Sequence, residues 1–109
     1  MSNFDDRKNM AEKKFVLTAE QEFRVDARRN KLLGIWAAER LGKKDDEVKT
    51  YYIEVIKSDM EEPGDEDVFR KVKQDFISAG VELTDEDLRS RMDVFLTEAR
   101  AQIADEAED

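Results

Sequence analysis

Hydrophobic side chains recur along most of this chain at intervals of three and four residues, the spacing that places them on one face of an α-helix. Shorter series run from Val48 to Ile56 and from Val68 to Phe76. The longest series lies near the C-terminus and consists of Leu88, Met92, Phe95, Leu96, Ala99 and Ile103. The pattern predicts amphipathic helices that bury their apolar faces in one shared core.

The segment from Ala19 to Leu41 differs because its second half is apolar on most sides. We expect this helix to be the central and most buried one. Gly34 within it is expected to let a neighbouring backbone approach closely. Trp36 belongs to the same apolar run and is interpreted as a core residue rather than a ligand contact.

Capping residues predict where the helices begin. Thr18 and Gln21 have the spacing of a capping box, in which each side chain bonds the other residue's free backbone N–H. Asp45 or Asp46 is predicted to cap the second helix, and Asp65 and Thr84 stand at the starts of the third and fourth.

Glycines predict where helices end. Gly42 and Gly80 follow apolar runs, and Gly80 is expected to let Val81 fold back onto Phe76. The predicted helices cover residues 19–41, 46–61, 66–79 and 85–103, followed by an acidic tail at 105–109.

The first residues form a weaker segment. Phe4, Ala11 and Phe15 share one narrow stripe, but the segment is only about 13 residues long, a length at which an isolated helix is marginal in water. We therefore expect an arm that is partly disordered or loosely docked until a partner buries Phe4 and Phe15.

Charge divides the chain into two parts. Residues 1–44 carry 11 Lys and Arg against 7 Asp and Glu, a net of +4, whereas residues 45–109 carry 8 against 21, a net of −13. The acidic part would repel phosphate, so a nucleic-acid partner is not expected. The basic part is expected to pair with the acidic part or with an acidic partner.

The composition argues against catalysis. The chain has no Cys and no His, which removes thiol chemistry, the usual proton shuttle and the commonest metal ligand. Asp65-Glu66-Asp67 lacks the glycine and the spaced ligands of a calcium loop, so no metal site is predicted. No phosphate loop or nucleophile motif is present. We expect a binding protein without a cofactor, not an enzyme.

Arg28, Arg29 and Lys31 are the candidate residues for binding a nucleotide phosphate. The alternative is a solvated helix face or pairing with the acidic part of the chain. No stretch of about 18 apolar residues occurs, so no membrane insertion is expected and a cytoplasmic location is predicted.

Three stretches resemble a known family: Asn3 to Arg7, Ala27 to Glu39, and Gly64 to Val72. They are similar to the zeta subunit of alphaproteobacterial F-type ATP synthases, many members of which are known only as a domain of unknown function. The similarity runs across nearly the whole chain.

This resemblance implies an all-α fold: a four-helix bundle at residues 18–104, preceded by a mobile arm at residues 1–17. Inhibitory members insert the arm as a helix into a catalytic interface of the ATP synthase head and so block ATP hydrolysis. The implied partner-binding residues are Phe4, Asp5, Asp6, Arg7, Lys8, Ala11, Lys14 and Phe15.

The predicted protein is therefore an inhibitory subunit that is monomeric when free and peripheral to the inner membrane through its partner. Two alternatives remain open at this stage. One is a nucleotide sensor that uses Arg28, Arg29 and Lys31 to bind adenine nucleotide weakly. The other is an adaptor without strong inhibitory activity.

Overall fold

The computed structural model describes residues 17–59 and 64–108, and within them the chain forms four α-helices and no strand. The predicted all-α class is confirmed. The predicted arm falls almost entirely on residues 1–16, outside the described part. The helices are α2 (Ala19–Arg40), α3 (Asp46–Ser58), α4 (Glu66–Ala79) and α5 (Asp85–Glu108).

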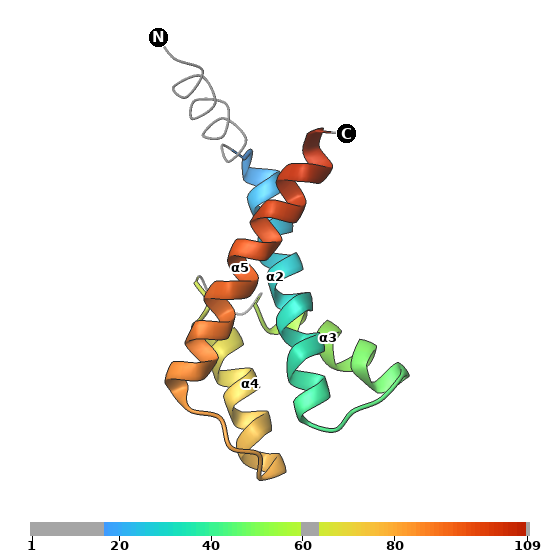
Figure 1. The fold of residues 1–109 in the computed structure, drawn as a ribbon, viewed down its shortest axis with the longest axis vertical. Helices are drawn as coiled ribbons and strands as arrows, with labels where there is room; N and C mark the ends of the chain where they lie inside the picture. The colour runs from blue at the N-terminus through green and yellow to red at the C-terminus, as the bar shows by residue number, and fades with distance from the viewer. Residues whose placement is uncertain (1–16, 60–63, 109) are drawn as a thin grey trace, which may run out of the picture.

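The two long helices, α2 and α5, lie side by side and run in opposite directions (Figure 1). The shorter helices α3 and α4 lie beside the half that contains the end of α2 and the start of α5. The other half of the pair consists of residues 17–32 and 96–107, which we call the stem. The arm therefore joins the fold at the stem rather than at the four-helix end.

Two groups of buried side chains match this division. The stem cluster is small: Val25, Ala99 and Ile103 are buried, with Leu17, Leu32 and Leu96 packed against them. The four-helix cluster is larger and draws on every helix; its buried members are Leu33, Ala37, Ala38, Tyr51, Val55, Val68, Val72, Phe76, Leu88 and Met92. Burial of this apolar surface is the main force that holds the helices together.

The predicted caps are largely present. Thr18 and Gln21 form the complete capping box, with N···O distances of 2.9 and 3.1 Å. The Thr84 hydroxyl accepts a bond from the Asp87 N–H at 3.0 Å at the start of α5. At the end of α4, Gly80 is left-handed and the Val81 N–H donates to the Phe76 carbonyl at 3.0 Å, as predicted.

One predicted capping bond and one predicted boundary are wrong, although α3 begins at residue 46 as predicted. Asp45 occupies the cap position of α3 but its side chain makes no capping bond; the Glu47 carboxylate accepts from the Lys44 N–H instead. At the other end of the chain, α5 does not stop at residue 103 but continues to Glu108, so most of the predicted acidic tail is helical. The extra turn is held by Ala104, which is buried, and by ion pairs of Glu106 with α2.

Helix α3 ends at Ser58, and the predicted end at residue 61 falls among residues 60–63, outside the described part. None of the described helices has the length and apolar character needed to span a bilayer.

Candidate functional site

The arm is attached to the fold at Leu17 and Thr18. Leu17 packs against the stem cluster, so the packed unit begins one residue earlier than predicted. Thr18 is extended and caps α2, which means that the helix starts at a defined residue. The predicted contact residues from Phe4 to Phe15 lie outside the described residues, so their roles stay predictions.

The stem is held together by ion pairs as well as by its small core. Glu106 of α5 accepts from Arg24 at 3.0 Å and pairs with Arg28 at 2.9 Å, and Arg28 also donates to Gln102 at 2.7 Å. The hydrogen bond from Arg28, together with the charges of both arginines, lowers the pKa of the Glu106 carboxyl. The predicted pairing of the basic part with the acidic part is therefore observed here.

The three candidate nucleotide-binding cations are not brought together. Arg28 turns toward α5, whereas Arg29 is buried and turns toward the start of α4, 3.8 Å from Asp65. The Lys31 ammonium lies 5.4 Å from the centre of the Tyr52 ring on α3. Each side chain serves a different helix contact, so this geometry favours a structural role for the basic run.

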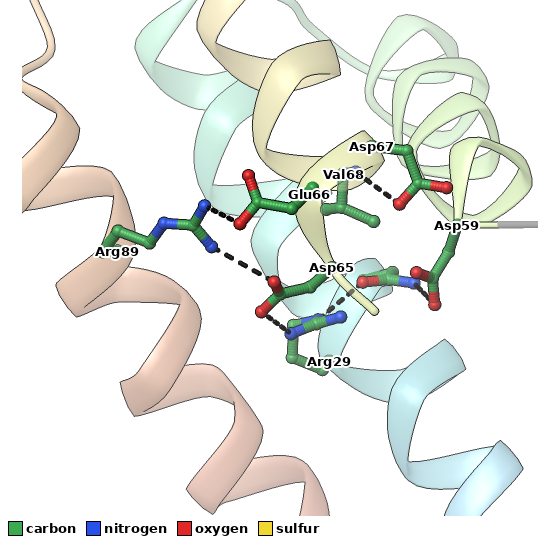
Figure 2. Close-up of polar contacts among 8 residues, drawn as sticks. Arg29, Asp59, Asp65, Glu66, Asp67, Val68 and Arg89 are labelled. Atoms are coloured by element: carbon green, nitrogen blue, oxygen red, sulfur yellow. Dashed lines mark hydrogen bonds and ion pairs between the residues drawn. The ribbon is translucent and has the colours of Figure 1, made fainter. Parts of the chain in front are cut away.

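Arg29 belongs to a largely buried network of hydrogen bonds and ion pairs, which Figure 2 shows. Its Nε donates to the Asn30 side-chain oxygen at 2.6 Å, and the Asn30 amide donates to Asp59 at 3.0 Å. Burial raises the pKa of the Asp59 carboxyl, although the Asn30 hydrogen bond and the Arg29 charge oppose that rise. The network fixes the end of α3 against the middle of α2.

The same network continues to α5. Asp65, directly before α4, lies between Arg29 of α2 and Arg89 of α5, which donates to it at 3.1 Å (Figure 2). Arg89 also binds Glu66. Asp67 is buried and accepts a bond from the Val68 N–H at 2.9 Å. All three carboxylates lie at the start of α4, where they suit the positive end of the helix, and Asp65 and Glu66 also link α4 to α5 through Arg89.

A second polar cluster joins α3 to α4. The buried Tyr51 hydroxyl donates to Asp75 at 2.8 Å, and burial together with that bond raises the pKa of the phenol. Burial alone would lower the pKa of the Lys71 ammonium, but its contacts with Glu54 and Asp75, at 2.8 and 3.0 Å, raise it. Tyr51 and Lys71 thus have structural roles at the contact of α3 with α4.

Neither network is a metal centre. Within residues 17–59 and 64–108, no three carboxylates are grouped so that they could hold a metal ion. Buried side-chain polar atoms in this part of the chain all have hydrogen-bond partners.

Trp36 packs against the core, as predicted, but it is only partly buried. Its ring contacts the core through Phe76 and Phe95, but one side borders a surface hollow of about 460 Å³. Arg40 and Arg91 lie over the ring in that hollow. Arg40 follows Trp36 by one helical turn, a signal visible in the sequence, whereas Arg91 comes from α5 and only the fold brings it there.

Comparison with known proteins identifies the family. Residues 1–102 match the family described as ATPase inhibitor subunit zeta. This chain belongs to the zeta family. The match includes the arm, the four-helix end and the stem as far as residue 102, and the resemblance noted in the sequence is confirmed.

A relative of this zeta-family chain has a solution NMR structure with the same fold. It is 44% identical to this chain, and the match covers 78% of this chain and 96% of the other with a TM-score of 0.69. No curated protein matches the chain. The family is thus established by sequence, and a solved structure supports the helical arrangement.

Proposed function

We propose that this zeta-family chain binds the catalytic head of an F-type ATP synthase and blocks ATP hydrolysis. In this proposal, residues 1–16 insert as a helix at a catalytic interface of the head, while Leu17 stays packed in the stem. One observation carries it: the match to a family of ATPase inhibitor subunits starts at residue 1 and so includes the arm together with the packed unit.

The arm has the features of a helix that gains its order on binding. Phe4, Ala11 and Phe15 share one stripe, which suits recognition of an amphipathic helix in an apolar groove. Alone, so short a stripe gains too little burial to offset the entropy of ordering the chain. In a groove, Phe4 and Phe15 would be the buried contacts.

Charged residues flank this stripe. Arg7, Lys8 and Lys14 would pair with carboxylates at the rim of the groove, and Asp5 and Asp6 suit the positive start of the inserted helix. Rim charges contribute more to the association rate and to orientation than to affinity.

The packed unit would anchor the arm rigidly and, through its size, obstruct movement of the subunits around it. Leu17 is held by the stem cluster and Thr18 by the capping box, so the arm starts from a defined point on the stem. A helical body attached there, too wide to follow the arm into a groove, would obstruct the relative motion of subunits at the interface. Inhibition would need no cofactor.

In this proposal the free chain is monomeric, lies in the cytoplasm and reaches the inner membrane through the synthase. Weak adenine-nucleotide binding by Arg28, Arg29 and Lys31 would require at least two of these side chains to leave their present contacts. If their NMR chemical shifts do not change at millimolar ATP, the sensor alternative is excluded.

The test is ATP hydrolysis by the cognate synthase head with the full chain and with a chain that lacks residues 1–16. The cut keeps Leu17 and the Thr18 cap, so the described core is left whole. We expect the full chain to inhibit and the shortened chain to be at least tenfold less potent. Equal inhibition by both would contradict the proposal and favour an adaptor that acts through its body.

A matched pair of substitutions sharpens this test. Phe15→Ala should weaken binding by about 2 kcal/mol if Phe15 is a central buried contact. Phe23→Ala is the control, because Phe23 lies outside the arm on α2 and is 68% exposed. Equal loss of affinity in both variants would show that the stripe is not the contact.

A further inference from the structure

Two arginines stand apart from the others on the long helices. Arg24, Arg28 and Arg29 of α2, and Arg89 and Arg100 of α5, each form an ion pair with a carboxylate. Arg40 of α2 and Arg91 of α5 form none with any described residue. In a chain this rich in acids, two arginines without a carboxylate require an explanation.

These two arginines converge on one aromatic ring. The Arg40 guanidinium carbon lies 5.1 Å from the centre of the Trp36 ring, and that of Arg91 lies 5.5 Å from it. They come from different helices, more than 50 residues apart in the sequence. A guanidinium over a ring interacts through its flat face and keeps its in-plane N–H groups available for an anion.

The ring that holds them is itself fixed. Trp36 stacks on the buried Phe76, with ring centres 6.0 Å apart and planes inclined by 20°, and Phe95 lies 6.4 Å away at a tilt. The two guanidiniums therefore rest on a part of the four-helix core rather than on a flexible loop. Such preorganisation lowers the cost of ordering both side chains when a ligand binds.

The side chains around the Trp36 ring include both polar and apolar ones. The hollow of about 460 Å³ next to Trp36 is lined by both arginines, Ser90, Leu83 and Val94, and also by Glu82 and Asp87. Val94 is 49% exposed although it lies on a well-formed helix. The hollow thus offers paired cationic donors and a hydroxyl beside an uncovered apolar rim; we call it the Trp36 hollow.

We propose that the Trp36 hollow is a second docking point for the partner, one that receives a carboxylate side chain of the synthase head between Arg40 and Arg91. An apolar neighbour of that carboxylate would cover Leu83 and Val94. This inference rests on the proposed function, since it assigns the body a contact with the same partner. It gives the four-helix end a binding role beside that of the arm.

A protein carboxylate fits the hollow better than a free polyanion does. The lining has two arginines and two acids, so its charges nearly balance, and a single carboxylate placed at the guanidiniums meets less repulsion from Glu82 and Asp87 than a more highly charged anion would. A partner segment supplies the carboxylate and the apolar cover together.

The test uses the full chain and its single tryptophan. Incorporation of 5-fluorotryptophan gives one ¹⁹F signal, from Trp36, which should shift or broaden when the unlabelled synthase head is added. The variant Arg40→Ala/Arg91→Ala should bind the head at least tenfold more weakly, as expected for loss of charged hydrogen bonds at a contact. Arg40→Lys/Arg91→Lys should recover part of the affinity, because it keeps the charge but not the planar donors.

The control is Lys49→Ala/Lys57→Ala, which removes two exposed positive charges from α3. It should leave affinity within about twofold of the wild-type value if net charge alone is not responsible. The lysine variant should unfold at nearly the same temperature as the wild type, since both lysines are exposed. The arginine variant also loses two cation–π contacts with Trp36, so its unfolding temperature should be somewhat lower, and binding is measured well below that temperature.

Each remaining outcome has a distinct meaning. If the wild-type chain inhibits but the arginine variant binds equally well, this inference fails and the proposed function stands. If the wild-type chain does not bind the head, both fail. If millimolar inorganic phosphate or ATP shifts the ¹⁹F signal and the head does not, the hollow is a small-anion site and the docking inference is overturned.

Discussion

Gly34 of α2 lies directly against the backbone of Tyr52 on α3. A Cβ atom placed on Gly34 would lie 2.5 Å from the Tyr52 Cβ and 2.6 Å from its Cα, closer than carbon atoms can pack. Both Tyr52 atoms are fixed to the main chain, so no side-chain rotation can relieve the contact. The absence of a side chain at position 34 therefore sets how closely α2 and α3 pack.

Gly34→Ala is expected to destabilise the fold. Alanine favours a helix interior by about 1 kcal/mol over glycine, so helix propensity alone would stabilise this variant. Forced separation of two packed helices costs about 1–3 kcal/mol. Because this contact is so short, we expect the packing cost to exceed the gain in helix propensity. Chemical denaturation would measure the difference.

The sign of the change in the free energy of unfolding shows whether close packing at Gly34 is real. A stabilisation of about 1 kcal/mol would mean that α2 and α3 are not in close contact. Tyr52→Ala should not rescue the variant, because alanine keeps the Cβ atom that causes the clash.

Asn30→Ala should remove the centre of the buried network. Asn30 is 1% exposed, accepts from Arg29 and donates to Asp59, so its loss leaves the buried Arg29 and the partly buried Asp59 each short of a partner. We expect a loss of about 2 kcal/mol in the free energy of unfolding. The pKa of Asp59 should rise further, because the hydrogen bond from Asn30 opposes the effect of burial.

Gln74→Ala is the matched control for Asn30, because Gln74 is an exposed amide whose side chain reaches Ser78. It should change stability by no more than about 0.5 kcal/mol. Denaturation curves give the stabilities, and an NMR titration of the side-chain carboxyl gives the Asp59 pKa. Equal effects of the two substitutions would show that the network adds nothing to the fold.

Stability should fall as the pH rises above 10. The pKa of Tyr51 is raised above its ordinary value of 10.0 and that of Lys71 above 10.5, so the folded chain keeps two protons that the unfolded chain releases. Fewer protons bound in the unfolded state means a negative slope of stability against pH. Below pH 10 both contributions are fully present.

Tyr51→Phe should make that alkaline fall less steep while lowering stability at neutral pH by about 1 kcal/mol through the lost bond to Asp75. Tyr52→Phe is the control, since its hydroxyl bonds to no described residue. Thermal unfolding between pH 8 and pH 11 would compare the three proteins. Identical profiles for Tyr51→Phe and the wild type would refute the role given to the phenol.

Glu106→Gln should loosen the last turns of α5. Its carboxylate holds Arg24 and Arg28 of α2 across the stem. Asp105→Asn is the control, because it removes the same charge from an exposed neighbour. Hydrogen exchange of the amides from residue 101 to 107 should be faster in Glu106→Gln than in Asp105→Asn, and equal rates would contradict the role of these pairs.

The stem is where sequence and tertiary structure disagree most. The hydrophobic pattern ends at Ile103, and the residues after it read as a solvated acidic tail. In the fold, Glu106 meets arginines 82 and 78 residues earlier in the chain, and those pairs extend the helix. A local sequence pattern cannot predict an ion-pair partner that is so distant in the sequence.

What the sequence determined by itself is local: four amphipathic helices, the Thr18 capping box and the Gly80 closure. The close approach at Gly34 was expected, but its partner, Tyr52, was set by the packing of α3 on α2. Caps act over three or four residues and helical faces repeat every 3.6, so a short window contains the whole cause. The placement of the helices against one another was decided only in three dimensions. That placement separates Arg28, Arg29 and Lys31, and it brings Arg91 to Trp36 beside Arg40, because the direction of each side chain's partner depends on the packing of the entire core.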